Sequence, residues 1–374
     1  MSHTASDLVC PTSQCVWGDQ SSRKFSCMQP KKVAYESRPA RLAFLDGFRG
    51  YAIVMVVATH AMAYAKLEDS TISLLTFWVQ AVAVPPFFLV DGFLFARNVG
   101  NCDYFSYGDY AVRSARRLLL PWACFSFLYV VFRAAFEYVS HPTHMLVLDR
   151  TVGEVLAAIY YSSVSSQMYF LPALFIIRLL FGAARALGLL QPSRLVIYWL
   201  ACVWVWQILP FSAEQGDKID PVLSAIWGMQ YYLLGMVLSS YDRPIAARPW
   251  VDVSIGFACL ATVKIFVPAW GVLSQYLYLV SLFVLFRGLG DRASSLSSLG
   301  RFTMGVYLIH APIILKVVSS GAQVVFDQSG IGRYLLTTSI AIFASLGIAR
   351  LCADVRWWKF MLGEEIGLAT NRAR

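Results

Sequence analysis

One histidine and two charged residues lie in a single apolar stretch near the start of the chain. The stretch is FLDGFRGYAIVMVVATHAMAYA, residues 44–65, and it contains Asp46, Arg49 and His60. On a helix of about 100° per residue, Arg49 and His60 point about 20° apart and Asp46 about 40° to the other side, so all three share one stripe. A rise of about 1.5 Å per residue separates Arg49 from His60 by about 16 Å along the axis. Ionisable side chains at membrane depth are costly, so we interpret the stripe as a functional site facing a bundle interior; the alternative is a structural histidine paired inside the bundle.

Three arginines form a second candidate site. Arg113, Arg116 and Arg117 lie in RSARRLLLPW, at the predicted inner end of an apolar run and about one turn before Pro121. Arg113 and Arg116 are three residues apart and share a helix face, where two guanidinium groups can hold one polyanion through forked hydrogen bonds. A phosphate-bearing cofactor or lipid fits this arrangement. The alternative is a set of topology-determining charges that contact lipid head groups.

Four more residues are candidates because they are polar or titratable within apolar runs. Tyr307 and His310, in LGRFTMGVYLIHAPIIL, lie on one helix face and indicate either an interhelical hydrogen bond or a catalytic role. Asp91, in PPFFLVDGFLFAR, is either a proton site or the partner of an arginine such as Arg49, and we favour the ion pair. Tyr169, in QMYFLPALF, is expected in an interfacial aromatic belt rather than in the site.

The composition is that of a membrane protein. Of 374 residues, 58% are hydrophobic and 14% are charged, whereas a soluble domain has about 25% charged residues. The formal net charge of +9 does not indicate nucleic-acid binding, because the basic residues lie mostly in the gaps between apolar runs, as membrane topology requires. The eight cysteines show no metal-type spacing, so we expect free thiols, no disulfide framework and no bound metal.

The apolar runs predict an all-α fold, a polytopic membrane helical bundle with about ten transmembrane helices. The predicted spans are residues 43–65, 74–96, 115–139, 166–187, 194–211, 221–240, 248–267, 270–288, 300–320 and 332–351. With the amino terminus in the cytoplasm, most of the 31 Lys and Arg residues fall on the inner side, and only Lys66, Arg150, Lys218 and Arg333 fall outside. This asymmetry follows the positive-inside rule for an even number of crossings, so both termini are predicted to be cytoplasmic.

One membrane domain accounts for most of the chain. Residues 1–40 are predicted to be a disordered cytoplasmic leader without a cleaved export signal, residues 41–355 the transmembrane domain and residues 356–374 a cytoplasmic tail. A weaker apolar run, residues 152–163, is too short to cross a bilayer. We expect it to form an interfacial or re-entrant helix on the loop that also carries His141 and His144.

The motif LDGFRGYAIVMVVATH resembles the opening signature of the acyltransferase 3 family of integral membrane acyltransferases, which is close to LDGLRGIAxxxVxxxH. The stretches FFLVDGFLFAR, RSARRLLLPW, QMYFLPALF and LGRFTMGVYLIHAPI follow in the order expected of the family, so the resemblance covers roughly residues 41–320. By this resemblance His60 is similar to the family's essential histidine and Arg49 to the arginine of its first motif. Arg113 and Arg116 are similar to its Arg-x-x-Arg pair.

The resemblance implies transfer of an acyl group, often acetyl, from cytoplasmic acyl-CoA to a hydroxyl of an extracytoplasmic glycan. The implied partners are acetyl-CoA or another acyl-CoA, a carbohydrate acceptor and the lipid bilayer, with no nucleic acid; the implied location is a bacterial inner membrane. The oligomeric state stays open. The chain departs from the family pattern at Asp91, where serine is common, and at Thr303 and Met304, where Ser-Tyr is more usual.

These residues suggest a mechanism. His60 is predicted to act as general base toward the acceptor hydroxyl. Arg113, Arg116 and Arg117 are predicted to hold the CoA phosphates at the inner end of a water-accessible channel, through which the pantetheine arm reaches the imidazole. Asp46 is expected to orient the neighbouring arginine or to cap the helix. A transient acyl-imidazole is the alternative to direct transfer.

Two other classes of function are compatible with the sequence. A proton-coupled secondary transporter or flippase would use Asp91 and His60 as a proton relay, although neither inverted repeats nor paired broken helices are visible. A scaffold with a degenerate site would account for the departures at Asp91 and Met304. In the enzyme, acceptor choice is expected to depend on the outer loops at residues 140–165, 211–220 and 321–332.

Overall fold

The computed structural model describes residues 42–65, 67–98, 105–141, 145–208, 214–215, 218–241, 249–266, 271–325 and 330–363. Its amino-terminal elements are α1 (Ala43–Ala65), α2 (Asp69–Trp78), η1 (Gln80–Val82), α3 (Pro85–Asn98), α4 (Tyr107–Ser140), α5 (Val152–Tyr160), η2 (Ser166–Tyr169) and α6 (Phe170–Ala186). The central elements are η3 (Pro192–Arg194), α7 (Leu195–Ile208), β1 (Glu214–Gln215), β2 (Lys218–Ile219), α8 (Pro221–Ser240), α9 (Pro249–Phe266) and α10 (Gly271–Leu289). The last elements are η4 (Gly290–Ala293), α11 (Ser294–Arg301), α12 (Thr303–Ile309), η5 (His310–Ile314), α13 (Leu315–Val325), α14 (Ile331–Cys352) and α15 (Arg356–Met361). The predicted leader, His144 and the last eleven residues of the predicted tail lie outside the described residues.

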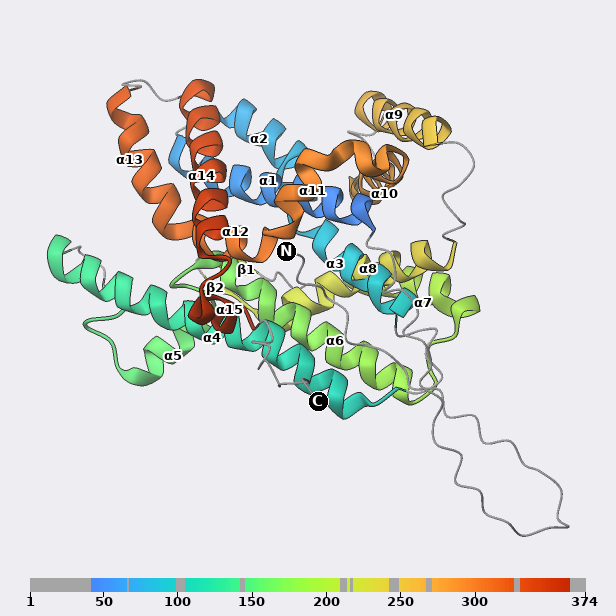
Figure 1. The fold of residues 1–374 in the computed structure, drawn as a ribbon, viewed down its shortest axis with the longest axis horizontal. Helices are drawn as coiled ribbons and strands as arrows, with labels where there is room; N and C mark the ends of the chain where they lie inside the picture. Colours follow the sequence, from blue (N-terminus) through green and yellow to red (C-terminus); the bar gives the residue numbers. More distant parts are fainter. Residues whose placement is uncertain are drawn as a thin grey trace, which may run out of the picture.

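The described part of the chain is a helical membrane bundle, as predicted (Figure 1). Its strands are the two-residue segments β1 and β2, which pair antiparallel. Seven helical stretches within the described residues are long and apolar enough to cross a membrane: 69–98, 107–140, 166–186, 221–240, 273–301, 303–324 and 331–352. The other three predicted spans coincide with α1, α7 and α9. Ten crossings therefore stay a prediction, whereas the all-α bundle is confirmed.

Helix α1 lies at the centre of the bundle. It contacts α3, α10, α11, α12, α13 and α14, and Phe48, Val57 and Ala61 on its surface are fully buried. Gly50 and Gly300 let the backbones of α1 and α11 touch, because a Cβ at either position would collide with a carbonyl of the opposite helix. Close approach at small residues is the usual way in which helices pack in a membrane. This packing fixes the position of α1, which carries the predicted stripe of Asp46, Arg49 and His60.

Prolines divide two of the predicted spans. Residues 74–96 were expected to form one helix, but they are split among α2, η1 and α3. Helix α3 begins at Pro85 and Pro86, where the missing N–H groups cost nothing because they belong to the first turn. The ninth predicted span is interrupted at η5: Ala311 is extended, with φ −130° and ψ 151°, as the residue before Pro312 prefers.

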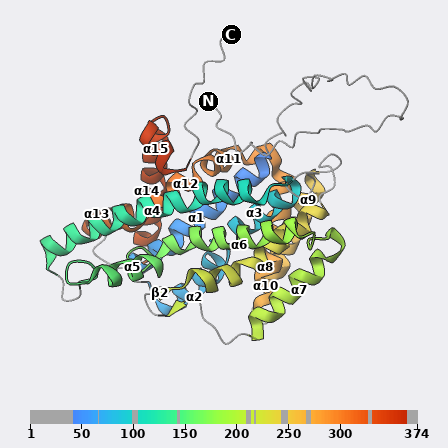
Figure 2. The same cartoon turned by 90° about the horizontal axis from the view of Figure 1, so that it is seen from below.

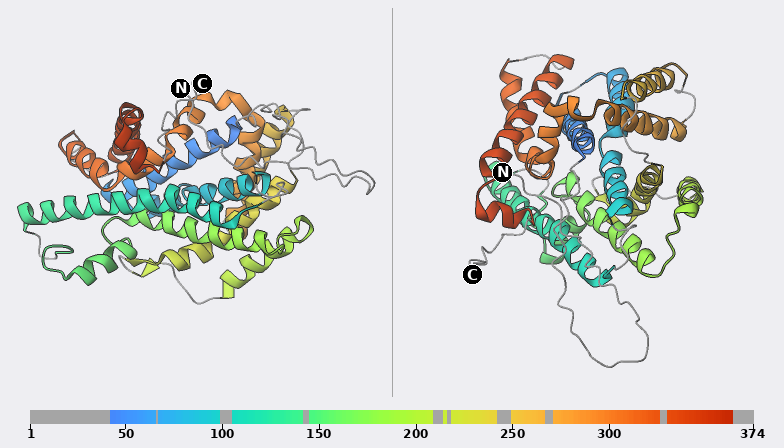
Figure 3. Two further views of the ribbon diagram at one scale, coloured as in Figure 1. Left: turned by 60° about the horizontal axis from the view of Figure 1, so that its bottom comes forward. Right: turned by 45° about the vertical axis from the view of Figure 1, so that its right-hand side comes forward.

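Helix α4 is longer than predicted. It begins at Tyr107, after Ser106 as N-cap, rather than near residue 115, and has 34 residues, about 50 Å against about 30 Å of bilayer hydrocarbon. Pro121 therefore lies near the middle of the helix and not one turn inside it. Helix α6 lies beside α4, which extends well beyond it (Figure 2; Figure 3).

The segment after α4 returns to the bundle without crossing it. Helix α5 has nine residues, none of them buried, and begins with a capping box between Thr151 and Glu154. Nine residues span about 14 Å, which is too short to cross a bilayer. The predicted tail begins as α15, whose Trp358 packs edge-on against Phe125, near the middle of α4, at 5.8 Å between ring centroids.

Candidate active site

Two imidazoles from distant parts of the chain face each other in the bundle. His60 belongs to α1 and His310 begins η5, and their ring centroids are 5.3 Å apart. His310 is fully buried, whereas His60 is half-buried. The local structure explains how His310 reaches this place: α12 carries it inward, and the break at Pro312 turns the chain just beyond it. His60 of the stripe predicted on α1 thus meets His310 of the predicted motif LGRFTMGVYLIHAPIIL.

The hydrogen bonds of His310 define which of its nitrogens is available. Nδ1 lies 2.7 Å from the carbonyl oxygen of Tyr307 and 3.2 Å from that of Val306. Carbonyl oxygens only accept, so Nδ1 carries the hydrogen and Nε2 of the neutral ring carries a lone pair. Among the described residues Nε2 is buried and has no hydrogen-bond partner. A buried lone pair next to a second imidazole is equipped to accept a proton.

A hydrogen-bonded frame holds the segment that carries His310. The Tyr307 hydroxyl donates to the carbonyl of Gln167, and the Gln167 amide donates to the carbonyl of Ala311. The Tyr129 hydroxyl of α4 donates to the carbonyl of Leu308. These three bonds connect α4 and η2 to the two sides of the imidazole. The sequence predicted Tyr307 as a candidate but not Gln167 or Tyr129. The available signal for Gln167 was a glutamine at the start of an apolar run.

Tyr169 follows this frame in sequence. It is half-buried at the end of η2. Its place in an interfacial aromatic belt stays a prediction.

Asp46 and Arg49 interact on α1. Their closest side-chain atoms, Asp46 Oδ1 and Arg49 Nη1, are 3.9 Å apart, and the Asp46 side chain is buried while that of Arg49 is 31% exposed. The buried carboxylate lies one turn from the guanidinium, and its predicted role in orienting Arg49 stays a prediction. Since Arg49 and His60 share α1, about 16 Å of helix axis separates the cation from the imidazole pair.

The three arginines of the second candidate site lie on α4, apart from the imidazoles. Arg113 is half-buried, and Arg116 and Arg117 are exposed. Thirteen residues of α4, about 20 Å of axis, separate Arg116 from Tyr129, whose hydroxyl reaches the His310 segment. The chain after α15 passes close to this cluster: Gly363 has φ +66°, and a Cβ there would collide with the carbonyl of Arg116. The structure thus places a basic surface and an imidazole pair at separate levels of the same bundle.

Asp91 forms an ion pair, but its partner is Arg178 of α6 rather than Arg49. Both carboxylate oxygens accept hydrogen bonds, one from Nε of Arg178 at 2.8 Å and one from Nη2. Both side chains are largely buried, so each charge satisfies the other. The ion pair was predicted, but the partner suggested from the sequence, Arg49, was wrong, because the partner in another helix depends on how the helices pack. The aspartate that replaces the family's serine therefore has a structural partner.

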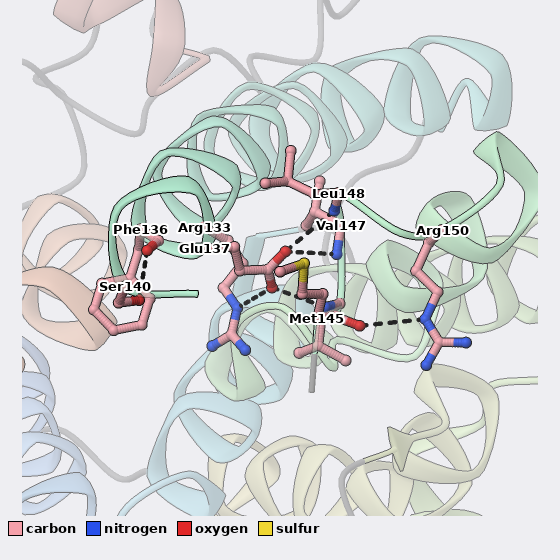
Figure 4. Close-up of polar contacts among 9 residues, drawn as sticks. Arg133, Phe136, Glu137, Ser140, Met145, Val147, Leu148 and Arg150 are labelled. Atoms are coloured by element: carbon pink, nitrogen blue, oxygen red, sulfur yellow. Dashed lines mark hydrogen bonds and ion pairs between the residues drawn. The ribbon is translucent and has the colours of Figure 1, made fainter. Parts of the chain in front are cut away.

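A buried carboxylate organises the loop that leads to α5 (Figure 4). Glu137 is fully buried. Its Oε1 accepts from Nε of Arg133 at 2.6 Å and from the backbone N–H of Leu146 at 2.7 Å, and its Oε2 accepts from the N–H groups of Val147 and Leu148 at 3.0 and 3.1 Å. Four donors on one carboxylate fix the start of the segment that later supplies Gln167 to the site.

The described residues contain no group of three or more His, Cys, Asp or Glu side chains that could hold a metal ion. Four cysteines in this part of the chain, Cys124, Cys202, Cys259 and Cys352, are free thiols.

The fold and the site define an integral membrane protein with two imidazoles meeting inside a helical bundle and an arginine cluster on a neighbouring helix. A family model described as an acyltransferase domain matches residues 42–350, most of the chain. The chain therefore belongs to the acyltransferase 3 family of membrane acyltransferases. Neither the curated proteins nor the solved structures gave a significant match.

Proposed function

We propose that the protein is an acyl-CoA-dependent O-acyltransferase that transfers an acyl group, acetyl in the first instance, to a hydroxyl of an extracytoplasmic glycan. The observation that carries this proposal is the imidazole pair of His60 and His310 inside a member of a membrane acyltransferase family. The reaction needs a proton acceptor for the attacking hydroxyl and a proton donor for the leaving thiolate, and an imidazole serves both purposes.

In the proposed mechanism His60 is the general base. It takes the proton of the acceptor hydroxyl while the oxygen attacks the thioester carbonyl carbon. The carbon–sulfur bond then breaks, and the CoA thiolate takes the proton from the imidazolium, so the products are the O-acyl ester and free CoA. His310 lies next to this ring with Nε2 as acceptor, which favours a positioning or proton-sharing role. An acyl-imidazole on His60 is the covalent variant of the same chemistry.

The arginine cluster is the proposed site for the phosphates of CoA. Arg113 and Arg116 share a face of α4, and Arg117 adjoins them. The pantetheine arm then extends along α4 through a channel toward the imidazoles, over about 20 Å. In this proposal the arginines and both termini lie on the cytoplasmic side of a bacterial inner membrane, and the α5 loop lies on the acceptor side.

The test uses purified protein with radiolabelled acetyl-CoA and membranes that supply the acceptor. His60→Ala should abolish transfer while the protein still inserts and stays monodisperse. His141→Ala is the matched control, because His141 is exposed at the end of α4 and should leave transfer unchanged. Undiminished transfer by His60→Ala would refute the mechanism.

The transporter alternative loses support from the ion pair at Asp91. A proton relay through Asp91 requires a carboxylate that is not already committed to a structural partner, but both of its oxygens accept hydrogen bonds from Arg178 in a largely buried ion pair. Uptake of substrate without transfer of the radiolabelled acetyl group would support the transporter hypothesis.

A further inference from the structure

Helix α14 carries an arginine on its buried face that has no counter-charge among the described residues. Arg333 is 6% exposed, and its Nε is buried without a hydrogen-bond partner. The largely buried Arg178, by comparison, is neutralised by Asp91. A buried ion without a counter-charge is strongly unfavourable. The burial of Arg333 therefore indicates that an anion from outside the described protein completes the pair.

A second buried polar group without a partner follows one turn later on the same face of α14. Thr337 is 1% exposed, and its Oγ1 has no hydrogen-bond partner in the part of the chain that the structure describes. The buried positions of α14 include 333, 337, 341, 345 and 349, whereas Leu335 and Phe343 are exposed. The buried face packs against α1, α12, α13 and η5. Arg333 and Thr337 therefore lie on the face toward the bundle and not on the face toward lipid.

The two residues lie near the imidazole pair. The N–H of Gly330, just before α14, donates to the carbonyl of Ala65 at the end of α1 at 3.3 Å, and α14 lies next to α13 there (Figure 1). His60 precedes Ala65 by about 7.5 Å of helix axis, and Arg333 follows Gly330 by about 4.5 Å. Helix α14 also contacts η5, which begins with His310. A ligand held by Arg333 therefore extends over a short distance to the imidazoles.

This position is separate from the proposed site for CoA. Arg113 and Arg116 lie on α4, about 20 Å of helix axis from Tyr129, whose hydroxyl reaches the His310 segment. In the proposed orientation α1 begins at the cytoplasmic side, so its end at Ala65, and with it the start of α14, lies on the acceptor side. The anion at Arg333 is therefore expected to belong to the acceptor and not to CoA.

The chemistry of the two side chains defines the group that they can bind. A guanidinium donates forked hydrogen bonds that match the oxygens of a carboxylate or phosphate. The hydroxyl of Thr337 can donate one further hydrogen bond to the same group. A neutral hydroxyl would leave the charge of Arg333 without compensation in a low-dielectric interior.

We propose that Arg333 and Thr337 bind a carboxylate or phosphate group of the acceptor and thereby hold its reacting hydroxyl at His60. The inference rests on the proposed acyltransferase function and adds a requirement for negative charge on the acceptor. It also gives the buried arginine a role in acceptor specificity, because a neutral analogue of the acceptor leaves the guanidinium unpaired.

The experiment measures binding without turnover. Full-length protein in detergent is saturated with CoA, so that the arginines of α4 are occupied, and its melting temperature is followed during titration with methyl glucuronide, glucose 6-phosphate or the neutral methyl glucoside. At least one of the two anionic probes should raise the melting temperature of the wild type, and the neutral probe should not. Arg333→Met should raise the Kd of that anionic probe at least about 10-fold. Thr337→Val should raise it about 3-fold.

The controls separate binding from folding. Without a probe, Arg333→Met should melt at or above the temperature of the wild type, because an unpaired buried charge is removed. Arg350→Met is the matched control on the same helix: Arg350 is exposed and donates to the hydroxyl of Ser298, and its loss should leave the effect of the probes unchanged. A lower melting temperature for Arg333→Met without a probe would show that the arginine has a structural partner, and the site would be wrong.

Transfer from radiolabelled acetyl-CoA separates this site from the proposed function. With native membranes as acceptor, Arg333→Met should raise the KM for the acceptor at least about 10-fold and leave the KM for acetyl-CoA unchanged. If the wild type transfers acetyl groups but binds neither anionic probe, the anion site is wrong and the proposed function stands. If it binds an anionic probe through Arg333 but transfers nothing, the proposed function fails and the anion site stands.

A lipid head group is the other source of a phosphate. The melting temperature is therefore also measured in nanodiscs of phosphatidylcholine with and without phosphatidylglycerol. The anionic lipid should have the same effect on the wild type and Arg333→Met. If it stabilises the wild type alone and the soluble probes have no effect, the arginine binds lipid, and its role toward the acceptor is refuted.

Discussion

Glu137 offers the sharpest test of how the loop between α4 and α5 is held in place. In Glu137→Gln one acceptor oxygen becomes an amide nitrogen, so two of the four donors on this side chain, drawn from Arg133, Leu146, Val147 and Leu148, lose their acceptor. Hydrogen bonds to a charged group contribute about 1.5–3 kcal/mol each. The lower value gives a loss of about 3 kcal/mol in the free energy of local opening, about 100-fold in hydrogen exchange.

Hydrogen–deuterium exchange of the detergent-solubilised protein measures this loss directly. The amides of residues 146–148 should exchange about 100-fold faster in Glu137→Gln, and more in Glu137→Ala. Because the same segment leads to Gln167, whose amide donates to the carbonyl of Ala311, the KM for the acceptor should rise while that for acetyl-CoA stays constant. Glu154→Gln is the control: this carboxylate caps α5 and its loss should affect exchange in α5 alone. Unchanged exchange at residues 146–148 in Glu137→Gln would show that the carboxylate does not hold the loop.

Three further predictions concern charged groups. Asp91→Asn should destabilise the protein by about 3–5 kcal/mol, because it leaves the buried Arg178 unpaired. The double variant Asp91→Leu/Arg178→Met should restore most of the melting temperature. Equal melting temperatures for the wild type and Asp91→Asn would contradict this prediction. Arg113→Ala and Arg116→Ala should each raise the KM for acyl-CoA about 10-fold with little change in kcat, and a loss of kcat alone would exclude phosphate binding. Hydrogen bonds from Thr151 and Arg150 lower the pKa of Glu154 from its ordinary 4.5. The cap of α5 should therefore be intact at neutral pH and lost as the pH falls through the lowered pKa. Hydrogen exchange in α5, corrected for its intrinsic rate, would contradict this if it were the same at pH 7 and pH 3.

The motifs of α1 and α4 were readable from the sequence because each lies within one helix. The spacing of Asp46, Arg49 and His60 fixes their common stripe wherever α1 is placed, and the same holds for Arg113 and Arg116 on α4. The family signature also lies mainly in such local patterns. The presence of the helices also followed from the lengths of the apolar runs. The breaks before Pro85 and at Pro312 were not predicted, although a proline within an apolar run is a signal for such a break.

Contacts between helices could not be read in this way. His310 faces His60, and Asp91 pairs with Arg178 rather than Arg49, only because the helices that carry them pack against one another. Tyr129 gave no signal in the sequence, because a tyrosine within an apolar run is ordinary until its hydrogen-bond partner is known.

The sequence by itself determined a membrane bundle of this acyltransferase family, with two histidines, His60 and His310, and four arginines, Arg49, Arg113, Arg116 and Arg117, among the candidates for chemistry. The tertiary structure alone decided that a second histidine lies against the first and that Tyr129 and Gln167 hold it. The physical reason is that helical periodicity fixes the relative positions of residues within one helix. Which residues of two different helices meet depends on how the side chains of the whole bundle pack.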